Sequence, residues 1–261
     1  MSSTRIHKPA ISIVIPTFNR AAKVLRAIDS VLRQSFADFE LIVVDDSSED
    51  QTKVWLSNVN DSRFRYLRVE HGGVAKARNA GVALAQADWL CFLDSDDVWR
   101  KHKLSEQVRY HVQHPDILIS QTEDVWIRDS VRVNKMNKHK IREGSIFRES
   151  LRLCLICCSS VMLSKKLFVE VGRFDETLKT CEDYDLWLRI LAFHPVGFIP
   201  KVLVTKFGGH ADQLSKKYPM MDSYRLVALK KLLTSAKLND QQREWVLEEI
   251  IYKENILLRK I

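Results

Sequence analysis

The amino-acid sequence predicts an α/β fold in which a mostly parallel sheet is flanked by helices and followed by a C-terminal helical extension. Short apolar runs alternate with segments of helical apolar spacing through the first 120 residues, which is typical of a parallel sheet covered on both faces. Helical spacing returns from about residue 220 onward. Acidic residues follow several predicted strands, and such sheets bind ligands beyond the carboxyl ends of their strands.

The first strand and helix are predicted from residue type and spacing. Residues 11–15 are mostly β-branched and are followed by Pro16, which favours a short buried strand. Within residues 21–35, Val24 and Ile28 belong to an apolar series at helical spacing. A strand followed by a helix is the unit that the rest of the first half repeats.

Further elements of the first half follow the same criteria. Strands are expected where short runs are apolar or β-branched, at residues 39–44, 64–69, 89–93 and 116–120. Helices are expected where apolar spacing or alanine content is helical, at residues 49–57, 73–86 and 101–114. Gly81 interrupts the second of these helical patterns.

The second half is less regular. We expect a strand at residues 159–163, a short helix at 165–171 and an amphipathic helix at 182–193. A group of short strands at 196–207 and two final helices within 220–261 are expected to follow. The final pair breaks near Asn239 and Asp240. Because its apolar faces need burial, we interpret this pair as a cap packed on the domain, and a helix that docks on a membrane surface or a partner is the alternative.

The composition is that of a folded globular protein. Of the 261 residues, 46% are hydrophobic and 28% are charged, which excludes wholesale disorder. No apolar run reaches the ~18 residues of a membrane span, and residues 1–9 have no apolar signal core, so we expect a cytoplasmic location. The five cysteines are expected to be buried free thiols, because no second Cys/His pair accompanies Cys154 and Cys157 as a zinc site would require.

The formal net charge of +8 predicts an affinity for anions. Six basic residues between Arg128 and Arg142 accompany one acid, Asp129. We interpret this segment as a solvated loop or as a loop that meets an anionic substrate or membrane, so peripheral association with the inner face of the membrane is one expectation. A nucleic-acid partner is not expected, because the sequence has no recognisable binding motif and its acidic clusters would repel phosphate.

Three acidic segments carry the predicted chemistry. The first, Asp45 and Asp46, ends the second predicted strand, and a turn that caps the next helix is the alternative interpretation. The third begins with Glu182 and Asp183 at the start of the amphipathic helix. One carboxylate there could act as a general base held at a rigid helix start, although acids at this position also stabilise the helix dipole.

The second acidic segment follows the fourth predicted strand. Asp94, Asp96 and Asp97 lie within four residues, and carboxylates this close repel one another unless a cation lies among them. Oxygen ligands favour Mg²⁺ or Mn²⁺, which substrate phosphates commonly complete. The segment therefore predicts a metal-bound diphosphate, and a polar turn is the alternative.

In this order and with their flanks, the three acidic segments resemble the inverting glycosyltransferases of family two, which have the GT-A fold. The resemblance covers residues 11–215. It rests on six motifs: IVIPTFNR at 13–20, VVDDSS at 43–48, GVAKARNAG at 73–81, FLDSDD at 92–97, VGRFDE at 171–176 and EDYDLWLR at 182–189. It implies a glycosyltransferase domain with a nucleotide-binding half at residues 1–120 and an acceptor half at residues 121–215. The helical extension follows at residues 216–261.

The resemblance also implies roles for individual residues. The nucleotide of a UDP-, dTDP- or GDP-sugar donor would contact residues at the strand ends and on the helix after Gly73, namely Pro16, Thr17, Phe18, Asp45, Asp46, Arg78, Asn79, Asp94 and Ser95. A divalent cation, Mn²⁺ or Mg²⁺, would be bound by Asp96, Asp94 and His210. Asp183 would be the general base, with Glu182 beside it.

The implied reaction transfers the sugar, with inversion, to a hydroxyl of a glycan, a lipid-linked saccharide or another acceptor, in polysaccharide or glycan assembly. Two alternatives remain open: a family member that binds a nucleotide sugar without turnover, and a metal-dependent nucleotidyltransferase. The sequence has neither a G-x-x-x-x-G-K-[ST] phosphate loop nor a G-x-G-x-x-G motif after the first strand. Kinase-like and dinucleotide-dependent enzymes are therefore not expected.

Overall fold

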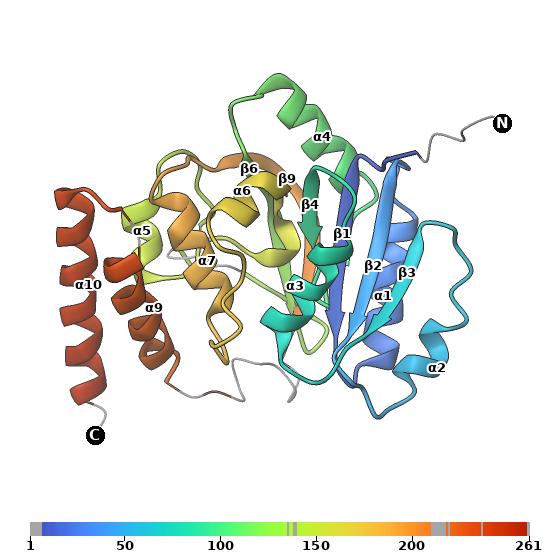
Figure 1. The fold of residues 1–261 in the computed structure, drawn as a ribbon, viewed down its shortest axis with the longest axis horizontal. Coiled ribbons are helices and arrows are strands. Elements are labelled where there is room, and N and C mark those ends of the chain that lie inside the picture. Colours follow the sequence, from blue (N-terminus) through green and yellow to red (C-terminus); the bar gives the residue numbers. More distant parts are fainter. Residues whose placement is uncertain are drawn as a thin grey trace.

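A mixed β-sheet with helices on both faces forms the body of the molecule (Figure 1). The structure is a computed structural model, and it describes residues 7–134, 136–137, 140–209, 218, 220–235 and 237–259. The strands are β1 (Ile11–Thr17), β2 (Phe39–Asp45), β3 (Phe64–Arg68), β4 (Trp89–Phe92), β5 (Val98–Trp99), β6 (Ile119–Arg128), β7 (Val131–Val133), β8 (Met162–Ser164) and β9 (Gly197–Gly208). The helices are α1 (Ala21–Leu32), α2 (Thr52–Leu56), α3 (Val74–Leu84), α4 (Lys103–Gln113), α5 (Phe147–Arg152), α6 (Lys165–Glu170), α7 (Glu182–Leu191), α9 (Met221–Ser235) and α10 (Asp240–Leu258), and a 3-10 turn covers Cys158–Ser160.

The N-terminal half of the sheet is parallel. Strand β1 pairs in parallel with β2 and β4, and β2 pairs in parallel with β3. The register places Thr17 beside Asp45, so the loop after β1 and the first acidic segment lie at the same edge. The second acidic segment follows β4 at that edge, because β4 pairs with β1 in the same direction. The predicted α/β fold with a mostly parallel sheet and flanking helices is confirmed.

Antiparallel pairs enter the sheet in its second half. Strand β8 pairs antiparallel with β4 and β6, whereas β6 and β9 run parallel. The prediction of several short strands over residues 196–207 is wrong: they belong to one twelve-residue strand, β9, which stays paired with β6 through irregularities at Glu123. The strand predicted over 116–120 is also longer than expected, and it continues to Arg128 before the β7 hairpin.

Side chains of β1 alternate between two cores, one on each face of the sheet. Ile13 and Ile15 pack with the buried side of α1, whereas Val14 faces the core that includes residues of α3. Gly81 does not interrupt α3: a Cβ atom there would stand 2.5 Å from Cγ1 of Val14, so the missing side chain lets the helix lie against the strand.

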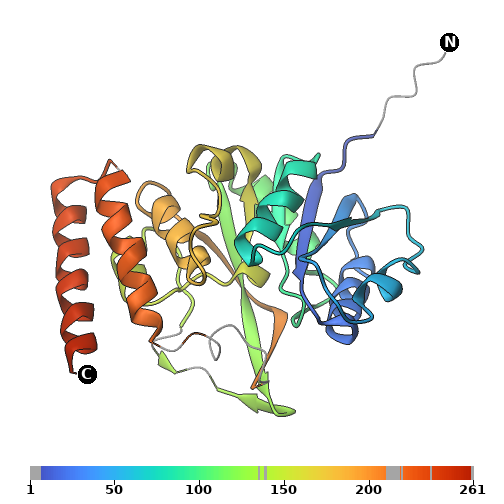
Figure 2. The same ribbon diagram turned by 60° about the horizontal axis from the view of Figure 1, so that its bottom comes forward.

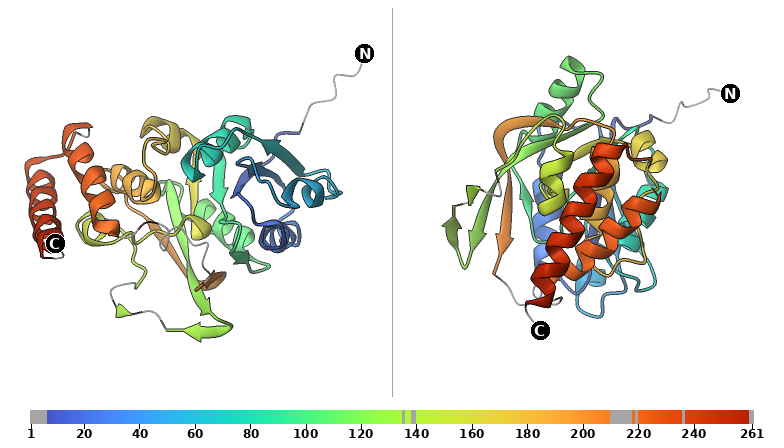
Figure 3. Two further views of the ribbon diagram at one scale, coloured as in Figure 1. Left: turned by 90° about the horizontal axis from the view of Figure 1, so that it is seen from below. Right: turned by 90° about the vertical axis from the view of Figure 1, so that its left-hand side faces the viewer.

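Helices α9 and α10 lie side by side at one end of the molecule (Figures 1 and 3). Their buried Leu229 and Val246 belong to the same core as Leu186 of α7, so the structure agrees with the interpretation of a packed cap. Asn239 begins α10 with a capping box, close to the predicted break. No helix in the described parts of the chain is long and apolar enough to cross a membrane.

Candidate active site

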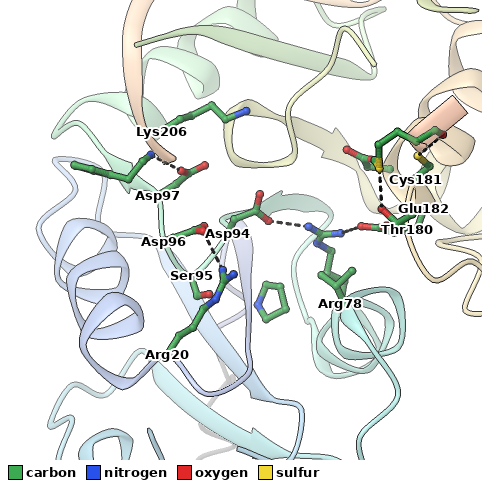
Figure 4. A pocket seen from close by; sticks show the side chains of 15 residues that line it. Arg20, Arg78, Asp94, Ser95, Asp96, Asp97, Thr180, Cys181, Glu182 and Lys206 are labelled. Atoms are coloured by element: carbon green, nitrogen blue, oxygen red, sulfur yellow. Dashed lines mark hydrogen bonds and ion pairs between the residues drawn. The ribbon is translucent and has the colours of Figure 1, made fainter. Parts of the chain in front are cut away.

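The second and third acidic segments line one cavity of about 290 Å³, which we call the acidic cavity (Figure 4). Its wall comes from the ends of β1, β4 and β9, from α3 and from the start of α7. Seven residues predicted from the sequence lie in this wall: Pro16, Arg78, Asp94, Ser95, Asp96, Glu182 and Asp183. Segments about 90 residues apart in the chain therefore share one site.

Arg78 of α3 joins the two acidic segments. Its guanidinium donates to Asp94 Oδ1 at 2.7 Å and to Glu182 Oε1 at 2.6 Å (Figure 4). Burial opposes the charge of Arg78, yet its acidic neighbours hold its pKa well above the usual value. Burial likewise favours protonation of Asp94, but Arg78 and other cations keep the pKa of that carboxyl below its usual value. Burial also raises the pKa of Glu182, although Arg78 opposes this rise.

Asp96 and Asp97 occupy different parts of the turn after β4. Arg20 donates to Asp96 Oδ2 at 2.9 Å inside the cavity. The carboxylate of Asp97 accepts from Ser159 Oγ at 2.6 Å and from the backbone of Phe207 at 3.1 Å. Burial raises the pKa of Asp97 to about 8, although the nearby Lys206 opposes this rise.

The start of α7 holds Asp183 in place. Cys181, the residue before the helix, has a left-handed backbone with φ of 62°, which is uncommon for a residue with a side chain. Asp183 Oδ1 accepts from the backbone of Tyr184 at 2.7 Å, and the Cys154 thiol donates to Oδ2 at 3.6 Å. Asp183 is half-buried at the cavity wall, in a position suited to accepting a proton.

The first acidic segment lies beside the cavity but not in its wall. Asp46 accepts from the backbone N–H groups of Gly72 and Gly73 at 2.8 and 2.9 Å. Asp45 is buried, and it accepts from the Tyr66 hydroxyl at 2.8 Å and from the backbone of Ser48 at 2.8 Å. These contacts match the turn interpretation, and they fix the loop that leads into α3 and thus to Arg78.

Four other predicted residues have different surroundings. The Thr17 side chain is buried, and Phe18 is half-exposed with its ring 4.5 Å from that of His71. Asn79 donates to the backbone of Phe174 at 2.9 Å, away from the cavity wall. His210 lies outside the described residues.

Two cations in the cavity wall were not identified from the sequence. Arg20 ends the first motif, so its position beside the strand end could have been noticed. Lys206 lies within β9 and reaches the cavity only because that strand pairs with β6. Together with Arg78 they supply positive charge where a phosphate group could bind.

The residues in the cavity wall fit a divalent cation only in part. Carboxylate oxygens of Asp94 and Asp96 reach the cavity, and such ligands suit Mg²⁺ or Mn²⁺. Each of these carboxylates pairs with an arginine, and no group of three potential His, Cys, Asp or Glu ligands occurs in the described part of the chain. A cation would therefore need further oxygen ligands from a bound substrate.

Residues 12–172 match the protein family described as glycosyl transferase family 2. The chain belongs to this family. The family predicted from the acidic segments is thereby confirmed, and so is the assignment of the chain as a glycosyltransferase by family.

Curated relatives point in the same direction. An uncharacterized glycosyltransferase of Rickettsia felis is 32% identical over 227 residues, which cover 81% of this chain and 36% of the relative. The UDP-Glc:alpha-D-GlcNAc-diphosphoundecaprenol beta-1,3-glucosyltransferase WfgD of Escherichia coli is 31% identical over 69% of each chain. The amylovoran biosynthesis glycosyltransferase AmsB of Erwinia amylovora is 31% identical over 86% of this chain and 79% of its own. The chain spans only about a third of the Rickettsia felis relative's length.

Solved structures share the fold. S. aureus TarS 1–349 in complex with UDP-GlcNAc superposes with a TM-score of 0.76 at 19% identity, covering 94% of this chain and 72% of that one. The mannosyltransferase PcManGT from Pyrobaculum calidifontis, in complex with GDP-Man and Mn²⁺, has a TM-score of 0.67 at 14% identity, covering 95% and 70%. At these identities the likeness establishes the fold alone.

Proposed function

We propose that this chain transfers a sugar from a nucleotide-sugar donor to an acceptor hydroxyl with inversion at the anomeric carbon. The observation that carries the proposal is the acidic cavity, which brings Asp94 and Asp96 together with Asp183. Asp94 and Asp96 can serve the donor diphosphate, while the carboxylate of Asp183 serves the acceptor hydroxyl. Membership of glycosyl transferase family 2 supports this division of roles.

We propose a UDP-sugar as the first donor to test. The name of the relative WfgD specifies UDP-Glc, and TarS was solved with UDP-GlcNAc. The nucleotide would bind at the carboxyl ends of β1 and β2, near Pro16 and Phe18. Arg20 and Lys206 would offset the charge of the diphosphate, because both line the cavity.

The reaction is a single displacement. Asp183 accepts the proton of the acceptor hydroxyl, and the acceptor oxygen forms a bond to the anomeric carbon. The bond between that carbon and the phosphate oxygen breaks, and the nucleoside diphosphate leaves with the bonding electrons. Attack from the side opposite the leaving group inverts the anomeric centre, and no covalent enzyme intermediate is required. A general base of this kind contributes ~10²–10⁴-fold.

We propose that Asp96, with Asp94 and the donor diphosphate, binds Mn²⁺ or Mg²⁺. His210, the remaining predicted ligand, stays a prediction. A divalent cation bound there would offset the negative charge that grows on the leaving diphosphate. Arg20, which pairs with Asp96 at 2.9 Å, would then be released to contact phosphate oxygens.

The proposed acceptor is a lipid-linked saccharide in polysaccharide assembly. The name of WfgD specifies a diphosphoundecaprenol-linked GlcNAc, and AmsB is named for amylovoran biosynthesis. An acceptor of this kind would require the protein to work at a membrane surface. Peripheral association from the cytoplasmic side therefore belongs to the proposal.

Thermal unfolding with a donor panel tests the proposed function. UDP-Glc, UDP-GlcNAc, dTDP-Glc and GDP-Man are each added with and without Mn²⁺. We expect one donor to raise Tm, because a ligand that binds only the folded state stabilises it, and we expect Mn²⁺ to enlarge the rise. Asp96→Asn should reduce the part of the rise in Tm that depends on Mn²⁺. Asp88→Asn, a matched change at an exposed aspartate outside the cavity wall, should leave it unchanged. A flat Tm with every donor contradicts the proposal.

A further inference from the structure

A second cavity of about 350 Å³ adjoins the acidic cavity. The two share Asp94, Asp183 and Lys206 in their walls. Asp183 therefore faces both spaces, so a molecule in the second cavity can reach the proposed general base without entering the donor site.

The remaining wall of the second cavity combines polar groups with apolar and aromatic ones. Strand β6 contributes Gln121 and Trp126, the segment before the 3-10 turn contributes Leu155 and Ile156, and α9 contributes Arg225. A purely apolar ligand does not match this wall because of Gln121 and Arg225, and a free inorganic anion does not match it because of the apolar Leu155 and Ile156. A sugar ring does, because it presents hydroxyl groups at its edge and C–H groups on its faces.

Two buried polar atoms in this wall have no protein partner among the described residues. Gln121 is fully buried, and while its Nε2 donates to the backbone of Arg142 at 3.1 Å, no described residue donates to its Oε1. Arg225 donates through Nη1 to Asp222 at 3.1 Å, but no residue in the described part of the chain accepts from its Nε–H. A buried polar group without a partner is costly, so each of these atoms is suited to a ligand. Sugar hydroxyls both donate and accept, and they can satisfy the two together.

Helix α9, which carries Arg225, contacts α7 and the residue before it. Lys231 of the same helix donates to Asp175 at 2.6 Å and to Asp185 of α7 at 3.1 Å. At the start of α9, the backbone carbonyl of Met221 lies 3.9 Å from the Cys181 sulfur. The helix therefore belongs to the wall of the site although it lies beyond residues 12–172, which match the family.

We propose that the second cavity binds the terminal sugar of the acceptor, with Gln121 and Arg225 as its specificity-determining residues. This inference rests on the proposed function. The sugar's reacting hydroxyl lies at the shared wall, where Asp183 takes its proton and its oxygen bonds to the anomeric carbon of the donor in the acidic cavity. The nucleoside diphosphate leaves with the electrons of the broken bond. The C-terminal extension thus takes part in acceptor selection.

Acceptor kinetics in two variants test this assignment. Gln121→Leu removes the carbonyl oxygen, together with the Nε2 that donates to Arg142, at similar size. Arg225→Lys keeps the charge beside Asp222 but removes the Nε–H. The acceptors are p-nitrophenyl glycosides of glucose, galactose and GlcNAc, and a short-chain polyprenyl diphosphate-linked GlcNAc. The donor is the one that raises Tm most strongly. Lys230→Gln, at an exposed position on α9, is the matched control.

We expect the acceptor KM to rise at least tenfold in both variants and to stay unchanged in the control. The donor KM and the donor-induced rise in Tm should equal those of the wild type. An unchanged acceptor KM in both variants would overturn this inference and leave the proposed function standing. A wild-type protein that binds a donor but glycosylates none of these sugars would also overturn it. If no donor binds, the proposed function fails first.

Discussion

Arg78 decides the geometry of the site at the scale of single residues. It is buried, and it holds Asp94 and Glu182, which come from segments almost 90 residues apart. The guanidinium carbon of Arg78 lies over the Phe174 ring, 5.2 Å from the ring centroid. Because its guanidinium donates to both carboxylates, Arg78 bridges the second and third acidic segments.

Replacement of Arg78 should therefore cost stability as well as activity. Arg78→Gln removes the cation beside the buried carboxylate of Glu182 and the half-buried carboxylate of Asp94, and we expect a loss of about 3–5 kcal/mol in the free energy of unfolding. Urea unfolding at neutral pH measures this. The matched control is Arg109→Gln, which breaks an exposed pair with Glu106 and should cost less than about 1 kcal/mol. Equal losses in the two variants would contradict the bridging role.

Sequence reasoning predicted the residues at strand ends better than their partners. Asp94 and Asp96 could be placed because the carboxyl ends of parallel strands meet at one edge. The partners of Asp46 could not, since they are the amides of Gly72 and Gly73, whose position depends on the folding of a whole loop. The catalytic and ligand-binding roles of these residues remain predictions.

Elements that depend on local periodicity were predicted well, and those that depend on distant pairing were not. Helix α7 follows from its apolar spacing, and its observed range, Glu182–Leu191, lies within the predicted one. Strand β5 is only two residues long, and it exists because Val98 and Trp99 pair with β9 across about 100 residues of sequence. No local pattern encodes a contact of that kind.

A buried histidine of α4, which contacts the start of β6, predicts that the stability of the protein depends on pH. His111 is buried and contacts the Ile117 carbonyl at 3.0 Å and Ser120 Oγ at 2.9 Å. Burial lowers its pKa from 6.5 to about 4. The unfolded chain therefore takes up a proton near pH 6.5 while the folded chain does not, so stability falls as the pH drops from about 6.5 towards 4.

Urea unfolding at pH 7, 6 and 5 checks this contribution. The wild type should lose up to about 1.4 kcal/mol per pH unit from His111 over that window. His111→Gln keeps hydrogen-bonding groups but cannot take up the proton, so its stability should fall less steeply. Parallel pH profiles for the two proteins would show that His111 is protonated equally in the folded and unfolded states.

The whole molecule is organised around two cores on opposite faces of one sheet. The core that includes Val14 continues through α7 to α9 and α10, so the C-terminal helices share it with the rest of the chain. Division into a domain of residues 1–215 and an extension of residues 216–261 remains a prediction, and this shared core argues that the two parts fold together. Asp183 lies beyond residues 12–172, the part that matches the family.

The basic segment gives a prediction at the same scale. The β6–β7 hairpin extends away from the body (Figure 2), and it exposes Arg128, Arg132 and the apolar Val131. We expect the protein to sediment with vesicles containing phosphatidylglycerol, and less so as salt rises, because exposed charges are screened. Changing Arg128 and Arg132 to Glu should reduce this binding.

The control for vesicle binding changes the net charge equally elsewhere. Arg33 is exposed at the end of α1 and Arg109 is exposed on α4, and their double change to Glu should weaken binding less than the hairpin change does. Vesicles of phosphatidylcholine alone should retain little of either protein. Equal loss in both double variants would mean that net charge, and not the hairpin, governs association.

The steady-state turnover of Asp183→Asn tests the central claim most directly, because the substitution removes the proposed base at nearly constant shape. With the donor identified by thermal shift, we predict that kcat falls by ~10²–10⁴-fold while the donor-induced rise in Tm is retained. Asp88→Asn should keep wild-type turnover. A kcat for Asp183→Asn within a few fold of the wild type would contradict the account.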